Sequence, residues 1–209
     1  MSDQAAAPLN VLVVCTGNIC RSPLAERLLH VQLEAAGIPA LVASAGTQSM
    51  IGHDMTPEAA QLAQHYGAEP SGHRSQQLTE RLIADADLVL TATREHRSAV
   101  VSLHPRASRY TYTLNQLARL LPAALEPNAQ DSPVELVETS QAGPVDAIRA
   151  LLTEVAATRG FSPPPPHADD DDIEDPYRQS NEVYARVGNV INATVTIITN
   201  GFATAVGRR

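Results

Sequence analysis

The sequence predicts an α/β fold, a doubly wound parallel sheet with helices on both faces, because strand-like and helix-like segments alternate along the chain. The first pair sets the pattern: residues 9–14 form an apolar run of strand length, and Leu24, Leu28 and Val31 then recur at helical spacing. In such folds, ligands bind beyond the carboxyl ends of the strands. The 209 residues are enough for a sizeable core, so we expect a single domain over residues 1–209.

Residue type and proline placement justify the other elements. Thr56-Pro57 is typical of a helix start, and Ser22-Pro23 has the same form, with Ser22 as the expected N-cap. Alternating Tyr and Thr over residues 109–114 indicate a strand. We expect strands at residues 9–14, 40–43, 87–92 and 109–114, and loops at 44–54 and 70–77. We expect helices at residues 23–36, 57–67, 79–86, 94–103, 115–121, 144–160 and 180–206.

Residues 122–172 interrupt this alternation. Apolar residues at helical spacing over 144–160 predict one amphipathic helix, but prolines punctuate the rest. Four prolines at 163–166 precede the acidic run 169–172, and together they predict an extended, mobile linker over 161–172. We therefore expect an insertion at about residues 122–172, which serves as a lid, a partner site or simple packing.

Charge and cysteine content narrow the range of partners. The net charge of −8, much of it within residues 169–175, argues against nucleic acid or an anionic membrane as a partner. The two cysteines lie in one short loop, which excludes a disulfide framework. We find neither a signal sequence nor an apolar run long enough to span a bilayer. We expect a cytoplasmic protein with no membrane partner.

The segment between the first strand and the first helix, residues 14–23, is predicted to bind an anion. A short loop that feeds a helix N-terminus aims several backbone N–H groups at one point, where the helix dipole adds positive charge. Gly17 and Asn18 tolerate the unusual backbone angles of such a loop. Arg21 supplies a planar fork that matches two phosphate oxygens. The same field favours the thiolate of Cys15, which is then a nucleophile aimed at phosphorus.

The segment Cys-Thr-Gly-Asn-Ile-Cys-Arg-Ser-Pro at residues 15–23 resembles the signature of the low-molecular-weight protein tyrosine phosphatases. That family has a second signature near the C-terminus, Asp-Pro followed by an aromatic residue, which matches Asp175-Pro176-Tyr177. The resemblance covers about residues 9–114 and 173–206. It implies four parallel strands and hydrolysis of phosphotyrosine in protein substrates through a phosphocysteine intermediate, with no metal and no cofactor.

The resemblance also implies roles for individual residues. Cys15 is the expected nucleophile, Arg21 the phosphate clamp, and Asp175 the acid that protonates the leaving oxygen and later activates water. Ser22 is expected to donate a hydrogen bond to the Cys15 sulfur. The family ties the loop asparagine to two serines and a histidine, which here match Asn18, Ser22, Ser44 and His73. The expected phosphate-binding loop comprises Thr16, Gly17, Asn18, Ile19, Cys20 and Ser22.

Substrate preference is less clearly indicated. The loop after the second strand lacks an aromatic residue, so Met50 or Ile51 is the expected apolar contact for a phenyl ring, and Tyr177 is the expected aromatic one. Relatives that act on phosphoarginine tend to carry Thr where this chain has Ile19, so the apolar side chain favours an aryl ring. Phosphoarginine hydrolysis stays open as a second activity.

Two more functions are compatible with the same loop. Arsenate reduction on the same fold typically passes oxidation to two further cysteines. The chain lacks them, which disfavours this activity. A phosphate-binding interaction module without catalysis would use the loop for binding, with residues 122–172 as its docking surface.

The second cysteine of the loop has two possible roles. Cys20 either forms a reversible, protective disulfide with Cys15 or merely packs. The scattered histidines have no metal-ligand spacing.

Overall fold

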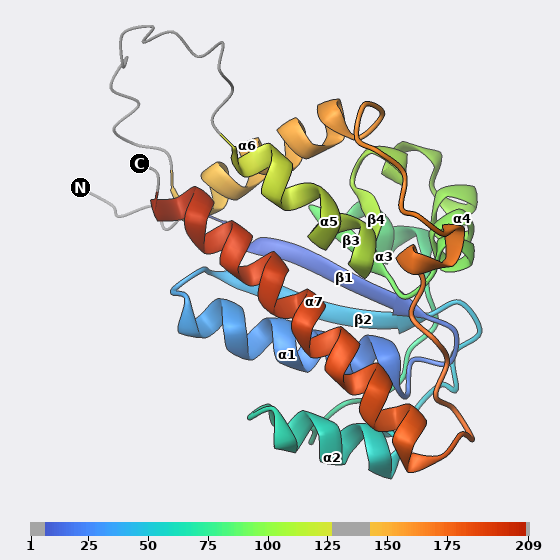
Figure 1. The fold of residues 1–209 in the computed structure, drawn as a ribbon. Helices are drawn as coiled ribbons and strands as arrows, with labels where there is room; N and C mark the ends of the chain where they lie inside the picture. The colour runs from blue at the N-terminus through green and yellow to red at the C-terminus, as the bar shows by residue number, and fades with distance from the viewer. Residues whose placement is uncertain (1–6, 127–142, 208–209) are drawn as a thin grey trace, which may run out of the picture.

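The computed structural model describes residues 7–126 and 143–207. In them, four parallel strands form one sheet in the order β2-β1-β3-β4, which confirms the predicted α/β fold (Figure 1). The strands are β1 (Leu9–Cys15), β2 (Ala40–Gly46), β3 (Leu88–Thr91) and β4 (Thr111–Thr113). The carboxyl end of β1, where Cys15 lies beside Gly46 of β2, is the edge at which such folds bind ligands.

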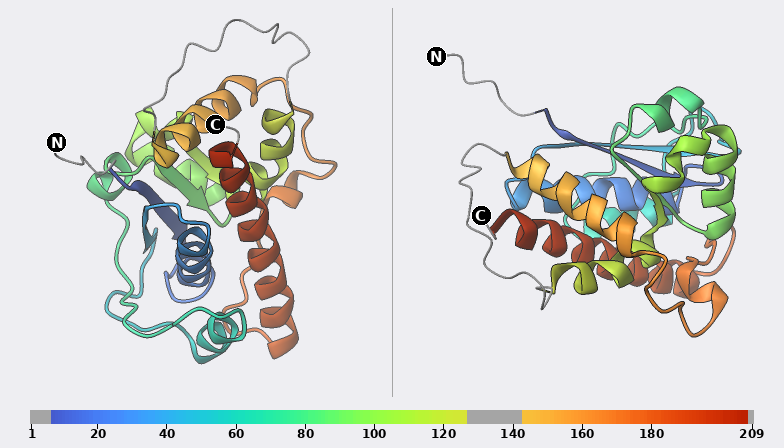
Figure 2. Two further views of the ribbon diagram at one scale, coloured as in Figure 1. Left: turned by 90° about the vertical axis from the view of Figure 1, so that its left-hand side faces the viewer. Right: turned by 90° about the horizontal axis from the view of Figure 1, so that it is seen from above.

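Helices cover both faces of the sheet, and β1 alternates between two cores. Val11 and Val13 join the larger core, whereas Leu12 and Val14 join the smaller one. Figure 2 shows α6 and α7 on the same side of the sheet. The larger core includes residues of α1 (Arg21–Ala35), α2 (Pro57–His65), α5 (Leu114–Leu125), α6 (Pro144–Thr158) and α7 (Asn181–Gly207). The smaller core includes residues of α3 (Glu80–Ala84), α4 (Arg94–Leu103) and the 3₁₀ helix η1 (Pro105–Arg109).

Two local predictions near β1 are wrong. Helix α1 begins at Arg21 with Cys20 at the N-cap position, and no described side chain caps it. Ser22 is therefore inside the helix and not its N-cap, because its hydroxyl group is engaged elsewhere. Strand β2 continues to Gly46, so Ser44 lies in a strand and not in the expected loop. A side chain at Gly46 would collide with the Thr16 carbonyl oxygen, so glycine lets β2 lie close against the loop that follows β1.

The predicted insertion is only partly as expected. Helix α5 continues through Pro122 to Leu125, past the expected break. Helix α6 is confirmed, and its buried apolar side packs on α5 and α7. Residues 127–142 lie outside the described residues. The prediction of a mobile linker is wrong for the acidic run, because Ala168–Asp171 forms the 3₁₀ helix η2 and the side chain of Asp171 is buried. That residues 122–172 are an insertion in a single domain stays a prediction.

Helix α7 corrects the expectation that no apolar run is long enough to span a bilayer. Among the described residues, this 27-residue helix has the length and composition to do so. It packs on α1, α2, α5 and α6, and Ile191, Ile198 and Phe202 are fully buried. A core helix of a folded domain passes the same test, and these contacts account for the apolar composition of α7.

Candidate active site

The loop between β1 and α1 wraps around the Cys15 side chain. Asn18 adopts a left-handed conformation with φ of 56°, one of the few non-glycine residue types that does so readily. This turn brings the Asn18 backbone N–H to 3.3 Å from Cys15 Sγ. The first N–H groups of α1, which no described side chain caps, begin at the same loop. An uncapped helix start is suited to bind an anion there.

The side chains of Ser22 and Cys15 are hydrogen-bonded to each other. Their Oγ and Sγ atoms are 2.9 Å apart, and both residues are buried. The Asn18 side-chain amide donates to the same Ser22 oxygen over 2.9 Å. Because that oxygen accepts from Asn18, its own hydrogen is free to point at the sulfur, where it stabilises a thiolate. The geometry fits the role expected for Ser22.

Asn18 is held by the residues expected from the resemblance. Its side-chain nitrogen also donates to Ser44 Oγ over 2.7 Å, and its backbone oxygen lies 2.8 Å from His73 Nε2. One further partner of Asn18 and one partner of Ser44 were not predicted. The backbone N–H of Gln76 donates to Asn18 Oδ1 over 2.9 Å, and Glu26 accepts a hydrogen bond from Ser44. With the bonds to Cys15 and Ser22 given above, five hydrogen bonds fix the left-handed residue that shapes the loop.

Arg21 and Asp175 meet at the same site although 154 positions separate them. Arg21 is buried, and its Nη2 lies 2.7 Å from Asp175 Oδ2. Its Nη1 donates to the Ile173 carbonyl oxygen over 2.9 Å. No residue that the structure describes accepts a hydrogen bond from Arg21 Nε, although this atom is buried. A phosphate oxygen bound in the loop is a suitable acceptor for it.

A cavity of about 170 Å³ opens above Cys15. Expected residues line it, with Gln48 as an addition that the sequence did not indicate. They are Cys15, Thr16, Gly17, Ile19, Cys20, Arg21, Gln48, Met50, Asp175 and Tyr177. The cavity thus brings together the proposed nucleophile, clamp, acid and apolar substrate contacts. A small phosphorylated group with an apolar body fits this combination.

Comparison with known proteins identifies the family. Residues 10–158 match the family model described as low molecular weight phosphotyrosine protein phosphatase. The chain belongs to this family. The probable low molecular weight protein-tyrosine-phosphatase EpsP of Ralstonia nicotianae is 33% identical over 144 residues, covering 68% of this chain and 97% of the relative. The corresponding phosphatase Etp of Escherichia coli is 36% identical over 107 residues, 51% of this chain and 70% of the relative.

Solved structures agree with the fold of this phosphatase. The tyrosine phosphatase AmsI of Erwinia amylovora is 25% identical with a TM-score of 0.61, covering 94% of this chain and 95% of that chain. The arginine phosphatase YwlE of Geobacillus stearothermophilus is 26% identical with a TM-score of 0.61, covering 92% of each chain. The family match ends at residue 158, so the position of Asp175 at the cavity rests on the structure and the Asp-Pro-Tyr motif.

A buried histidine of the phosphatase was missed by the sequence analysis. His96 of α4 lies with Nε2 2.8 Å from Thr16 Oγ1 and Nδ1 2.6 Å from Thr93 Oγ1. Burial, helped by the nearby Arg21 charge, lowers the pKa of His96 to about 4, so the ring is neutral at pH 7. Nothing in the sequence links residue 96 to residue 16; they meet because β3 pairs beside β1.

Cys20 lies in the same loop but in a different environment. Its sulfur is 3.4 Å from the Tyr184 hydroxyl oxygen and 3.6 Å from that of Thr56. Burial raises the pKa of the Cys20 thiol despite these hydrogen bonds, so Cys20 is the poorer nucleophile. Both cysteines are free thiols in this structure. A regulatory disulfide between them stays a prediction.

Proposed function

We propose that this phosphatase hydrolyses phosphotyrosine in protein substrates through a phosphocysteine intermediate. The observation that carries the proposal is the arrangement around Cys15: a serine hydroxyl group 2.9 Å from its sulfur and, in the same cavity, the buried guanidinium of Arg21 paired with Asp175. A nucleophile, an anion clamp and a proton carrier are the three parts that phosphoryl transfer to a thiolate requires.

The reaction has two steps. The Cys15 thiolate attacks phosphorus, the bond from phosphorus to the tyrosine oxygen breaks, and protonated Asp175 gives its proton to that oxygen. Arg21 and the loop N–H groups stabilise the charge on the equatorial oxygens. Water then attacks the phosphocysteine, ionised Asp175 takes the water proton, and the phosphorus–sulfur bond breaks. Phosphate leaves, and the Ser22 hydroxyl group again stabilises the departing thiolate.

An aryl substrate is supported by the cavity lining. Ile19, Met50 and Tyr177 all border the cavity, so a phenyl ring finds apolar and aromatic contacts beyond the phosphate. The similarity to an arginine phosphatase structure keeps phosphoarginine as the second candidate. Ile19 favours an aryl phosphate as the substrate, because its apolar side chain offers no hydrogen-bond acceptor to the N–H groups of a guanidinium. We also propose a cytoplasmic location, where both free thiols stay reduced.

The decisive experiment is rapid-quench trapping with a phosphorus-labelled phosphotyrosine peptide, in the presence of a chelator. We expect label on the wild-type protein that mild acid releases, as it does from a phosphorus–sulfur bond, and no such acid-labile label on Cys15→Ser. Phosphoserine and phosphoarginine peptides run side by side test the substrate class. A complex with the phosphotyrosine peptide that is never cleaved would instead support a phosphate-binding interaction module. Turnover that persists in Cys15→Ser would remove Cys15 from its role.

A further inference from the structure

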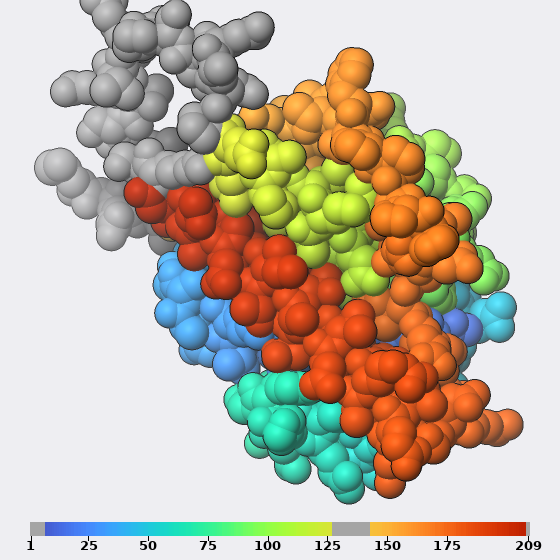
Figure 3. Space-filling view, in the orientation of Figure 1, coloured from blue at the N-terminus to red at the C-terminus, as the bar shows by residue number. Residues whose placement is uncertain are grey.

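Residues 168–175, here called the acidic strap, run over the surface of α5 towards the start of α7 (Figure 3). Five of the six carboxylates in the strap face an arginine from another part of the chain. The pairs are Asp169 and Asp172 with Arg94, Asp171 with Arg119, Glu174 with Arg186, and Asp175 with Arg21. These arginines lie on α4, α5, α7 and α1. The strap is therefore fixed at several points along its length.

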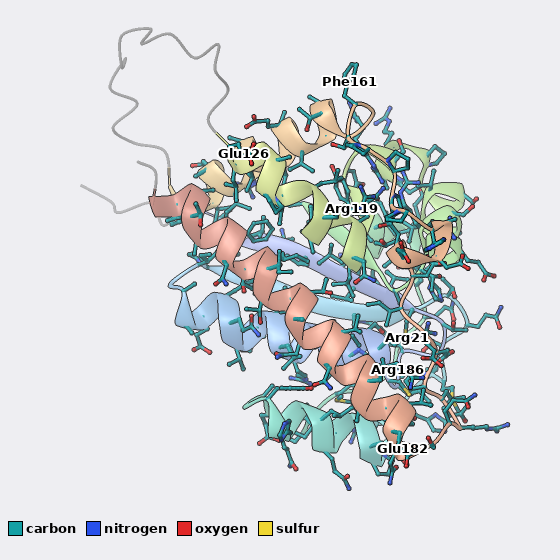
Figure 4. The ribbon with its side chains drawn as sticks, in the orientation of Figure 1. Arg21, Arg119, Glu126, Phe161, Glu182 and Arg186 are labelled. Atoms are coloured by element: carbon teal, nitrogen blue, oxygen red, sulfur yellow. The ribbon has the colours of Figure 1, made fainter. Side chains whose placement is uncertain are left out.

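Among the carboxylates of the strap, Asp171 forms its ion pair in a buried position. It is 5% exposed, and its two carboxylate oxygens lie 3.1 and 3.3 Å from Arg119 Nη2. Figure 4 labels Arg119 on α5 beside the strap, with Arg21 farther along it. The same guanidinium donates to the Pro163 carbonyl oxygen over 2.8 Å. A buried carboxylate that loses its cation is left uncompensated, so this pair strongly constrains the strap.

Asp172 connects the strap to the carboxyl end of β3. Its Oδ1 accepts the backbone N–H of Arg94, the first residue of α4, over 2.8 Å. The next residue, Ile173, is buried; its N–H donates to Ala92 over 2.8 Å and its carbonyl oxygen accepts from Arg21 over 2.9 Å. The backbone is thus pinned to the sheet and to the phosphate clamp two residues before Asp175.

We propose that Asp171 and Asp172 are positioning residues for Asp175, which hold the strap so that the Asp175 carboxyl group stays at the cavity above Cys15. The inference rests on the proposed function, because it concerns the acid of that reaction. The strap carries the Asp175 loop, and Asp175 itself is 49% exposed. In the free protein Arg21 holds it over 2.7 Å, but a bound phosphate takes that guanidinium, and the position of Asp175 then depends on the contacts that precede it. An acid displaced by about 1 Å loses about 10²-fold in rate.

The experiment measures turnover of aryl phosphates with good and poor leaving groups by Asp171→Asn and Asp172→Ala. We expect each variant to lose about tenfold or more on phenyl phosphate and far less on p-nitrophenyl phosphate, because only the poor leaving group needs the proton. Inhibition by inorganic phosphate should not weaken, since Cys15, Arg21 and the loop are untouched. Asp172→Asn should restore most of the loss of Asp172→Ala, because its amide oxygen still accepts the Arg94 N–H.

Two controls sharpen the result. Asp169→Asn removes the same charge from the same strap, but its carboxylate is 92% exposed, so we expect little effect. In an Asp175→Asn background, Asp171→Asn should add no further leaving-group dependence, because the acid it positions is already gone.

Three outcomes overturn the inference: an equal loss on all leaving groups, no loss at all, or a loss accompanied by weaker phosphate inhibition. A wild-type protein that fails to cleave either aryl phosphate would instead overturn the proposed function.

Discussion

Asp175 Oδ2 lies 2.7 Å from Arg21 Nη2, so the proposed acid and the proposed phosphate clamp form an ion pair in the free protein. A phosphate group that binds in the loop needs the same guanidinium. Substrate binding therefore exchanges one anionic partner of Arg21 for another. The released Asp175 then lies near the leaving oxygen, where it can act in proton transfer.

Replacing Asp175 by Asn tests both sides of this exchange. We expect kcat on phenyl phosphate to fall by about 10²–10³-fold, with a smaller fall on p-nitrophenyl phosphate, because general acid catalysis is lost. Inhibition by inorganic phosphate should tighten, because the competing carboxylate is absent and Arg21 is free. Steady-state kinetics with both esters measures these effects. Weaker phosphate inhibition would show that the ion pair supports the loop instead of competing with phosphate.

Ser22→Ala removes the hydroxyl group that points at the Cys15 sulfur. Hydrogen bonds to charged groups contribute about 1.5–3 kcal/mol, so we expect the Cys15 thiolate to form less readily and its alkylation by iodoacetate at neutral pH to slow by about tenfold or more. The rate of iodoacetate alkylation at fixed pH measures this change. Hydrolysis of the phosphocysteine should slow, visible as a burst of phenol release. Ser102→Ala, on an exposed face of α4, is the matched control and should leave both unchanged.

Ile19→Thr tests how the cavity chooses its substrate. A hydroxyl group there can accept from a guanidinium, and the apolar contact for an aryl ring becomes smaller. We expect the ratio of kcat/KM for phosphoarginine to that for phosphotyrosine to rise by about tenfold or more. Ile197→Thr makes the same change at a site that is 45% exposed on α7 and should leave the ratio as it is. A constant ratio in Ile19→Thr would remove Ile19 as a specificity residue.

His96 makes stability depend on pH. Its pKa is lowered to about 4 by burial and by Arg21, whereas in the unfolded chain it is near 6.5. Between these values the unfolded state binds more protons, so the free energy of unfolding falls as pH drops from 6.5 to 4, by at most roughly 3 kcal/mol. Denaturant titrations of His96→Asn should show a flatter pH dependence in this range. His30→Asn, exposed on α1, should retain the wild-type slope.

The sequence predicted the sheet because its signals are local. Residues 9–14 and 94–103 have the length, spacing and flanking residues of one strand and one helix; the helix is observed with the predicted bounds and the strand is one residue longer. The phosphate-binding loop from Cys15 to Ser22 could also be predicted, since its functional residues lie within eight consecutive positions. The Ser22 N-cap was wrong, because the hydroxyl group bonds to the sulfur and to Asn18 in preference to capping α1.

The remaining features depend on tertiary contacts between distant residues, which the sequence does not show. His96 reaches Thr16 only through the β1–β3 pairing, and a single sequence does not show strand order. The acidic run was predicted as part of a mobile linker, because its arginine partners lie 52 to 78 positions away on α4 and α5. Glu26 and Gln76, which complete the Asn18 network, gave no sign in the sequence for the same reason.

The pairing of the strap has a consequence for how a substrate approaches. A bare run of six carboxylates beside the cavity would repel a phosphate dianion before it reached Arg21. Here four guanidinium groups stand among them, so most of that negative charge is compensated. The mouth of the cavity therefore admits a doubly negative group past the most acidic stretch of the chain.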